Sequence, residues 1–294
     1  MEAQLLRTFV AVARRGSFSA AAVDLGYTQA AISQQIAALE SDLKVPLLNR
    51  RPVSPTEAGA RLLEHAEALL LRLDAARADV TRMTQAPAAT LVVGATPLAA
   101  GSPGLALALA ALRRRLPRLD VAVQVGPREH VLTAVARGEF DVGLADGLTA
   151  RGDPLPEFSS LTAVRVSQAA VAIVLPGDHP LAGRAGLRLS DLADARWIEA
   201  PDVASPLQEI RRLAGVDGFR PSFRYDGSDV VSLIRLAAAG HGLTLLPETA
   251  LAPTAITAVP VATPRVVHRV ELVHGTAREG SPAAELAAML APRG

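Results

Sequence analysis

The sequence predicts an α/β protein that has a helical DNA-binding domain at its N-terminus, a long connecting helix and a larger α/β domain of two lobes. Three observations carry this prediction. Residues 17–50 hold two short helical patterns joined by a glycine, residues 56–83 form one uninterrupted helical pattern, and strand and helix patterns alternate from residue 90 onward. With 294 residues, half of them apolar, the chain is long enough for two or three domains with their own cores.

The second helical pattern of the N-terminal region has two different faces. Apolar residues at spacings of four, three and four predict a face that packs on a core: Ile32, Ile36, Leu39 and Leu43. The other face carries small or amide side chains, which allow close approach to base edges and, for glutamine, paired hydrogen bonds with adenine: Gln29, Ala30, Ser33, Gln34 and Ala37. Thr28 is the predicted N-cap and Gly26 the turn before it. The pattern indicates a helix-turn-helix that reads DNA in the major groove.

The order of these features resembles the N-terminal domain of LysR-type transcriptional regulators. The residues that match the family pattern are Ser17, Phe18, Ser19, Ala21, Ala22, Leu25, Gln29, Ser33, Gln35, Ile36, Leu39, Glu40, Leu43, Leu47 and Arg50. Lys44 stands where the family usually has glycine. An ordinary amphipathic helix pair would share the apolar stripe but not Ser17, Gln29, Ser33 and Glu40 together. The resemblance implies that residues 1–58 form a winged helix-turn-helix that binds double-stranded promoter DNA.

Two arginines follow in the segment that the resemblance assigns to the wing. Arg50 and Arg51 are the candidates for contacts to DNA phosphates, because a guanidinium binds phosphate oxygens without base information. The alternative is that both are solvated loop charges. The overall charge gives little support for DNA binding, since the formal net charge is +1 and residues 1–60 carry six basic against five acidic residues. A dimer would double the number of contacts between basic side chains and DNA phosphates, and it would reach two half-sites of the DNA.

Residues 59–84 are predicted to form a linker and dimerisation helix. The side chains that alternate at spacings of four and three, as in a coiled-coil seam, are Leu62, Ala66, Leu69, Leu73, Ala76, Val80 and Met83. The alternative is a helix packed on the core of its own chain, and Leu63 and Leu70 widen the stripe in that direction. The LysR resemblance also implies a dimer helix here. Pro87 predicts a hinge at residues 85–89.

The rest of the chain alternates between strand and helix. Strands are expected at 91–95, 121–125 and 140–145. One helix is expected from Pro103 to Leu116, and another follows the second strand and ends at Arg137. This alternation favours a parallel sheet. A second lobe follows, with a strand at 169–175, a short helix and a strand within 189–200, and a helix at 205–215.

Three further segments extend the LysR resemblance over essentially the whole chain: GEFDVGLADG at 138–147, GDHPLA at 177–182 and AAGHGLTLLPETAL at 238–251. The resemblance implies that the C-terminal segment returns to the first lobe, as in periplasmic binding proteins. Lobe I is then expected to comprise residues 90–163 and 269–294, and lobe II residues 164–268.

A cleft between two such lobes is the expected site of a small-molecule effector, because strand ends and helix N-termini converge there and favour an anion. Placed by the resemblance, the candidate effector-binding residues are Thr96, Ser102, Arg128 and Ser205, with Tyr225 and Asp226 as weaker candidates. The alternatives are that Thr96, Ser102 and Ser205 cap helices and that Arg128 is solvated. Aromatic residues make up only 3% of the chain, which disfavours a stacking pocket for a large planar ligand.

Other classes of protein fit the sequence less well. None of the common hydrolase, dinucleotide-binding or phosphate-binding motifs occurs, Lys44 is the only lysine, and His241 lies between two glycines as expected of a surface turn. A solute-binding or enzymatic α/β protein would leave residues 1–83 unexplained. A purely architectural DNA binder would leave residues 90–294 without a role. We expect a cytoplasmic homodimer or homotetramer, without metal, cofactor, disulfide or membrane span.

Overall fold

The computed structural model describes residues 2–84, 90–156, 158, 161–251, 256–275 and 280–291, with the backbone alone for 78, 79 and 81–84. The predicted hinge at 85–89 and the side chain of Met83 lie outside these residues. The chain divides into two compact units, residues 1–81 and 82–294. Among the described helices, none combines the length and the apolar character that crossing a membrane requires.

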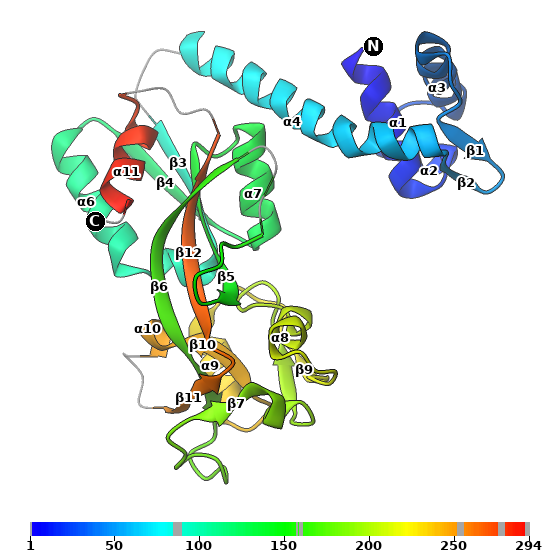
Figure 1. Cartoon of the computed structure of the whole chain (residues 1–294). Coiled ribbons are helices and arrows are strands. Elements are labelled where there is room, and N and C mark those ends of the chain that lie inside the picture. Colours follow the sequence, from blue (N-terminus) through cyan, green and yellow to red (C-terminus); the bar gives the residue numbers. More distant parts are fainter. Residues whose placement is uncertain are drawn as a thin grey trace. The chain divides into compact units, whose positions relative to one another are not determined.

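The first unit is a three-helix domain with a hairpin and a long helix (Figure 1). Its elements are α1 (Ala3–Arg15), α2 (Phe18–Leu25), α3 (Gln29–Leu43), β1 (Leu48–Arg50), β2 (Val53–Pro55) and α4 (Glu57–Thr84). The core of this unit holds Phe9 and Val12 from α1, Phe18 from α2, and Ile32 and Ile36 from α3, all buried. The amphipathic stripe predicted for the second helix therefore packs on the two helices before it.

The turn between α2 and α3 has the predicted chemistry. Gly26 adopts a left-handed conformation with φ of 70°, and the Thr28 hydroxyl accepts a hydrogen bond from the amide of Ala31 at 3.2 Å. Leu43 was expected in the apolar stripe, and this prediction is wrong, because its side chain is 38% exposed. The helix ends at Lys44, which has φ of 55°, so the chain turns away and Leu47 fills the core instead.

The expected wing is a short antiparallel hairpin. Strand β1 pairs with β2 through Leu48 with Pro55 and Arg50 with Val53. The next residue, Thr56, directly precedes α4, and its hydroxyl accepts a hydrogen bond from the amide of Gly59 at 3.0 Å. Helix α4 then runs without a break to Thr84, as the sequence predicts.

The seam predicted on α4 is divided between two environments. Ala66 is fully buried and Leu62 packs against the core of the helix-turn-helix, so these two residues are covered by their own chain. Further along, Leu69 is 46% exposed and Val80 is 61% exposed. The prediction of a coiled-coil seam is therefore wrong for Leu62 and Ala66. The alternative, a helix that packs on the core of its own chain, is correct for this part of α4.

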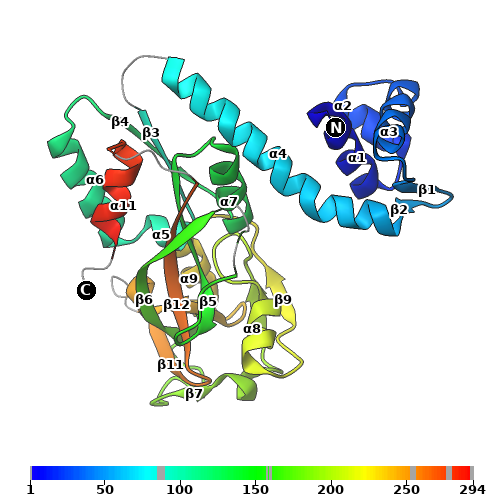
Figure 2. The same ribbon diagram turned by 45° about the horizontal axis from the view of Figure 1, so that its top comes forward.

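The second unit contains one eight-stranded sheet, a two-stranded sheet and helices around them (Figures 1 and 2). Its strands are β3 (Thr90–Ala95), β4 (Asp120–Val125), β5 (Val142–Ala150), β6 (Thr162–Leu175), β7 (Leu187–Arg188), β8 (Trp197–Glu199), β9 (Pro221–Arg224), β10 (Thr244–Pro247), β11 (Thr257–Thr263) and β12 (Val266–His274). Its helices are α5 (Pro97–Ala100), α6 (Pro103–Arg115), α7 (Arg128–Arg137), the 3-10 helix η1 (Leu189–Leu192), α8 (Leu207–Ala214), α9 (Val230–Ala238), α10 (Glu248–Leu251) and α11 (Pro282–Leu290).

The large sheet is mixed, which corrects the expectation of a parallel sheet. Strands β3, β4 and β5 are parallel, as predicted, but β12 is antiparallel to both β5 and β6, and β10 and β11 are antiparallel to β6. The long strands β6 and β12 run in opposite directions along the second unit (Figure 1). Neighbouring strands with opposite directions can only pair in the antiparallel manner.

These long strands connect two lobes with separate cores. The core of lobe I includes Leu91 and Val93 of β3, Leu112 of α6 and Leu286 of α11. Packing of the C-terminal helix there agrees with the expected return of the chain to lobe I. The core of lobe II includes Trp197 and Phe219, and Leu148 of β5 also packs there. The boundaries expected at 163 and 269 fall within the continuous strands β6 and β12, so the strands themselves cross between lobes.

Candidate DNA-reading surface and effector pocket

The outer face of α3 presents short polar side chains to solvent. Gln29, Ala30 and Gln34 are exposed and Ser33 is half-buried, while Ile32 and Ile36 face the core. The Gln29 side-chain oxygen accepts a hydrogen bond from the Ser19 hydroxyl at 3.1 Å, which links it to α2. The four residues predicted to read bases therefore lie on one accessible surface, which holds no bulky side chain that would keep α3 from a groove.

Glu40 joins α3 to the wing, a role that the sequence analysis missed. One oxygen of its carboxylate accepts the backbone amides of Leu47 at 2.8 Å and Leu48 at 3.2 Å. The other oxygen accepts Arg50 Nη2 at 3.1 Å. Because a charged acceptor binds amides more strongly than a neutral one, this carboxylate fixes the start of the hairpin against the reading helix.

The two candidate phosphate-binding arginines differ in their surroundings. The Arg50 guanidinium is paired with Glu40, and its central carbon lies 5.1 Å from the centroid of the Phe18 ring, so it contributes to the structure of the domain. Arg51 is exposed in the turn between the strands of the wing and has no ionic partner among the described residues. Of the two, Arg51 is the side chain whose donors are entirely available for phosphate oxygens.

Several other arginines of the first unit are already neutralised. Arg7 of α1 pairs with Asp74 of α4, Arg14 pairs with Glu67 at 2.7 Å, and Arg15 pairs with Asp24 at 2.5 Å. These pairs hold α1 against its neighbours. They also mean that these three guanidinium groups are already engaged with carboxylates rather than free for DNA phosphates.

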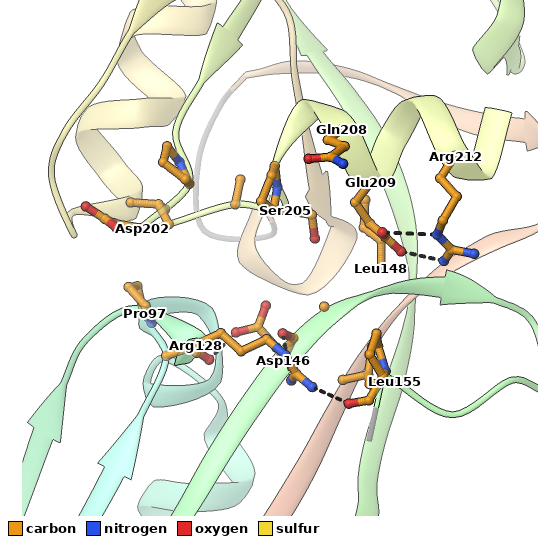
Figure 3. Close-up of a pocket in the computed structure, with 17 residues that line it drawn as sticks. Pro97, Arg128, Asp146, Leu148, Leu155, Asp202, Ser205, Gln208, Glu209 and Arg212 are labelled. Carbon is orange, nitrogen blue, oxygen red and sulfur yellow. Dashed lines mark hydrogen bonds and ion pairs between the residues drawn. The ribbon is translucent and has the colours of Figure 1, made fainter. Parts of the chain in front are cut away.

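The second unit has a cavity of about 400 Å³ between its two lobes (Figure 3). Its lobe I wall comes from the start of α5 and the residue before it, from α7, from β5 and from the segment after β5. Its lobe II wall comes from the loop after β8 and from α8. The residues that line it are Thr96, Pro97, Arg128, Asp146, Gly147, Leu148, Leu155, Pro156, Pro201, Asp202, Val203, Ala204, Ser205, Pro206, Gln208, Glu209 and Arg212. None of them is aromatic, in keeping with the sequence.

The structure brings only half of the predicted effector-binding residues to this cavity. Thr96, Arg128 and Ser205 line it, from loops and helices of both lobes. Ser102 instead caps α6, since its hydroxyl accepts the amide of Leu105 at 3.4 Å. The Tyr225 hydroxyl donates to the carbonyl oxygen of Asp229, and Asp226 pairs with Arg224 at 2.8 Å. These last three residues are absent from the cavity wall because their side chains are used for local structure.

Of the charged residues predicted to bind the effector, only Arg128 lies on the wall, where it is half-buried and forms no ion pair with a carboxylate among the described residues. Its guanidinium donates to the carbonyl oxygens of Asp146 at 3.5 Å and Pro156 at 3.2 Å. Burial lowers the pKa of Arg128 from its ordinary value, while Glu271, Asp146 and Glu209 act in the opposite direction. Arginine stays protonated even so, and this leaves a cation at the cavity wall.

A buried polar network supports the lobe I wall. The Asp146 carboxylate accepts the Thr96 hydroxyl, and its other oxygen lies 2.6 Å from Nε2 of His268. Both side chains of the Asp146 and His268 pair are less than 10% exposed. Asp146 lies within the segment at 138–147 that resembles the LysR family, but the part played by His268 has no local signal, because 122 positions separate it from Asp146.

On the lobe II wall, two carboxylates differ in whether they are paired. Glu209 receives two hydrogen bonds from Arg212, at 2.5 and 3.1 Å (Figure 3). Asp202, in the loop before α8, has no hydrogen-bonding or ionic partner among the described residues. The cavity wall therefore holds one unpaired cation from lobe I and one unpaired carboxylate from lobe II.

His241, noted in the sequence, and His179, within the segment at 177–182, both have structural surroundings. His241 is exposed in its turn, as predicted, and its ring lies 5.0 Å from that of Phe223. His179 accepts the amide of Leu181 at 3.2 Å through Nδ1. Neither of them lines the cavity.

Comparison with known proteins gives matches over both units. The model of the bacterial regulatory helix-turn-helix of the lysR family matches residues 3–60, and the model of the LysR substrate-binding domain matches residues 84–291. The transcriptional dual regulator GltC of Bacillus subtilis is 28% identical over 97% of this chain and 94% of its own length.

A probable hydrogen peroxide-inducible genes activator of Mycobacterium leprae is 32% identical over 83% of this chain and 77% of its own length. Among solved structures, full-length BenM has the same fold, with a TM-score of 0.55 and 24% identity over 99% of this chain and 95% of that one. GltC and the Mycobacterium leprae protein are both named as regulators of gene expression rather than as enzymes. The chain therefore belongs to the LysR family and is a DNA-binding transcriptional regulator with a helix-turn-helix domain and a substrate-binding domain.

Proposed function

We propose that this regulator binds promoter DNA in the cytoplasm as a homo-oligomer, and that a small molecule in the cavity between the lobes changes that binding. The observation that carries the proposal is the cavity itself, which is formed by both lobes and has on its wall the half-buried guanidinium of Arg128, without an ion-pair partner among the described residues. A ligand that contacts both walls has a different affinity for closed and open lobes. Only such a difference allows a ligand to shift a conformational equilibrium.

For the DNA side, the proposed base-reading residues are Gln29, Ala30, Ser33 and Gln34. Their support is accessibility on one face of α3 together with side chains short enough to approach base edges. Arg51 is the proposed phosphate contact of the wing, and Arg50 contributes mainly by holding the wing to α3.

For oligomerisation, the proposed contact is the part of α4 that its own unit leaves uncovered: Leu69, Leu73, Ala76 and Val80. Leu69 and Val80 are large apolar side chains in water, and covering them with a second copy would remove that surface. Leu62 and Ala66 are excluded from this contact because they are packed within their own chain.

For the effector, the proposed contacts are Thr96, Arg128 and Ser205. One relative is described as a probable hydrogen peroxide-inducible genes activator, but this sequence contains no cysteine. A thiol or disulfide switch is therefore impossible in this chain, and regulation by a bound molecule is the reading that its residues support.

The proposal can be tested by gel shift on promoter fragments that the protein retains from its own genome. A low-molecular-mass extract of the source cells should change the affinity of the wild-type protein for these fragments. Arg128→Ala should bind the fragments but no longer respond to the extract. Arg118→Ala, which removes an exposed arginine of lobe I outside the cavity, should respond like the wild type. An unchanged response of Arg128→Ala would show that the cavity is not the effector site.

A further inference from the structure

The charges on the walls of the cavity restrict the class of ligand. We propose that the cavity binds a small aliphatic amino acid, a molecule with one carboxylate and one ammonium group. This inference rests on the proposed effector function and goes beyond it, because it names the chemistry of the ligand.

Arg128 provides the site for the carboxylate. Its guanidinium is half-buried and donates hydrogen bonds to the carbonyl oxygens of Asp146 and Pro156. Glu271, Asp146 and Glu209 act on its charge, but among the described residues no carboxylate oxygen forms an ion pair with it. A cation that is partly withdrawn from water is stabilised by a ligand that supplies a carboxylate and accepts hydrogen bonds from it directly. Ser205 and Gln208 lie on the opposite wall and offer neutral donors (Figure 3). A carboxylate between them would be held by both lobes.

Asp202 provides the site for the ammonium group. The other two carboxylates of the wall are already satisfied, Asp146 by Thr96 and His268, and Glu209 by Arg212. Asp202 is the one carboxylate of the wall without a partner among the described residues. A ligand without a cationic group that covered Asp202 would displace water from its carboxylate without replacing the lost hydrogen bonds. A dicarboxylate would add repulsion to that cost. An ammonium group would neutralise Asp202 and donate hydrogen bonds to it.

The remainder of the wall fits an aliphatic frame. The apolar residues that line the cavity are Pro97, Leu148, Leu155, Pro156, Pro201, Val203, Ala204 and Pro206. None of these side chains offers an aromatic ring for stacking. The volume of about 400 Å³ lies near the lower end of the range for small-molecule pockets, so the ligand is small.

The test uses the purified full-length protein and sets of compounds that share one carbon frame. Calorimetry measures the affinity for each aliphatic α-amino acid and for 5-aminopentanoate. Each affinity is compared with that for the carboxylic acid that lacks the amine and that for the amine that lacks the carboxylate. Glutarate serves as the dicarboxylate. At least one amino acid should bind about tenfold or more tightly than both of its matched partners, since each charged group contributes a charge-assisted hydrogen bond.

Two variants separate the contributions of Arg128 and Asp202. Asp202→Asn should lose the preference for the amino acid over its deaminated partner, whereas Arg128→Ala should lose affinity for both. Asp194→Asn, which changes an exposed carboxylate of the same lobe outside the cavity, should behave as the wild type. The proposal is overturned if glutarate or a simple carboxylate binds as tightly as the amino acid, if Asp202→Asn keeps the preference, or if none of the compounds binds.

The gel shift with cell extract distinguishes this failure from failure of the proposed function. If the extract alters DNA binding through Arg128 while no amino acid binds, the effector site stands and the ligand class is wrong. If an amino acid binds with the expected preference but neither it nor the extract alters DNA binding, the ligand class stands and the regulatory role is wrong.

Discussion

At the scale of single residues, Glu40 shows how one carboxylate organises the DNA-binding domain. Glu40→Ala would leave the amides of Leu47 and Leu48 without their acceptor, a loss of about 1 to 3 kcal/mol. Hydrogen exchange of residues 47–55 in the full chain should become faster by about 5- to 150-fold, because local opening then costs less. Glu64→Ala, which removes an exposed pair with Arg61, should leave exchange in the wing unchanged. Equal effects of the two variants would contradict this role.

The buried Asp146 and His268 pair is the corresponding feature of the second unit. His268→Leu would leave the Asp146 carboxylate buried with only the Thr96 hydroxyl as side-chain partner, and removing one partner of a buried polar group costs about 1 to 3 kcal/mol. The thermal unfolding of the substrate-binding domain should shift to lower temperature. His241→Leu, at an exposed position, serves as the control. A melting temperature like that of the wild type would show that the pair contributes little.

At the scale of elements, α3 and the wing should separate specificity from affinity. Gln34→Ala should weaken binding to the specific site by about 1 to 3 kcal/mol and relax the preference at one base position. Arg51→Ala should weaken binding to specific and random DNA by the same factor and lower the salt dependence. Quantitative gel shifts on both kinds of DNA measure this. Equal losses on both kinds of DNA for Gln34→Ala would contradict its assignment to base reading.

Helix α4 gives a second prediction at this scale. Leu69→Asp places a charge in the exposed apolar part of the helix, and burying that charge against a second copy would cost several kcal/mol. Light scattering should show a smaller or more weakly associated species, and affinity for paired half-sites should fall. Ala60→Asp adds the same charge at an exposed position outside this part of the helix and should leave the mass unchanged. A wild-type mass for Leu69→Asp would exclude this surface as the contact.

At the scale of the whole molecule, the two sites should be coupled reciprocally. If a bound effector changes the affinity for promoter DNA by some factor, bound DNA must change the affinity for the effector by the same factor, typically 5- to 150-fold or about 1 to 3 kcal/mol. Calorimetric titration of the extract-derived effector with and without promoter DNA measures this. Ser205→Ala should weaken the response while leaving DNA binding of the free protein intact. Unequal factors in the two directions would mean that the effector does not act through binding equilibria.

The sequence by itself determined the features that depend on neighbouring residues. The cap at Thr28, the turn at Gly26 and the uninterrupted helix from Glu57 to Thr84 all follow from signals that act within a turn or two of chain. The alternation of strands and helices in lobe I follows for the same reason. Together with the ordered motifs of the helix-turn-helix, these local signals were enough for the fold class and the family.

Only the tertiary structure decided which distant residues meet. His268 reaches Asp146 across 122 positions, and Arg50 is paired with Glu40 and placed over Phe18. The same holds for the antiparallel pairing of β6 with β12, which depends on how the chain crosses between the lobes. A periodic pattern identifies an apolar face but not what covers it, and so Leu62 and Ala66 pack on their own chain whereas Leu69 and Val80 are left in water.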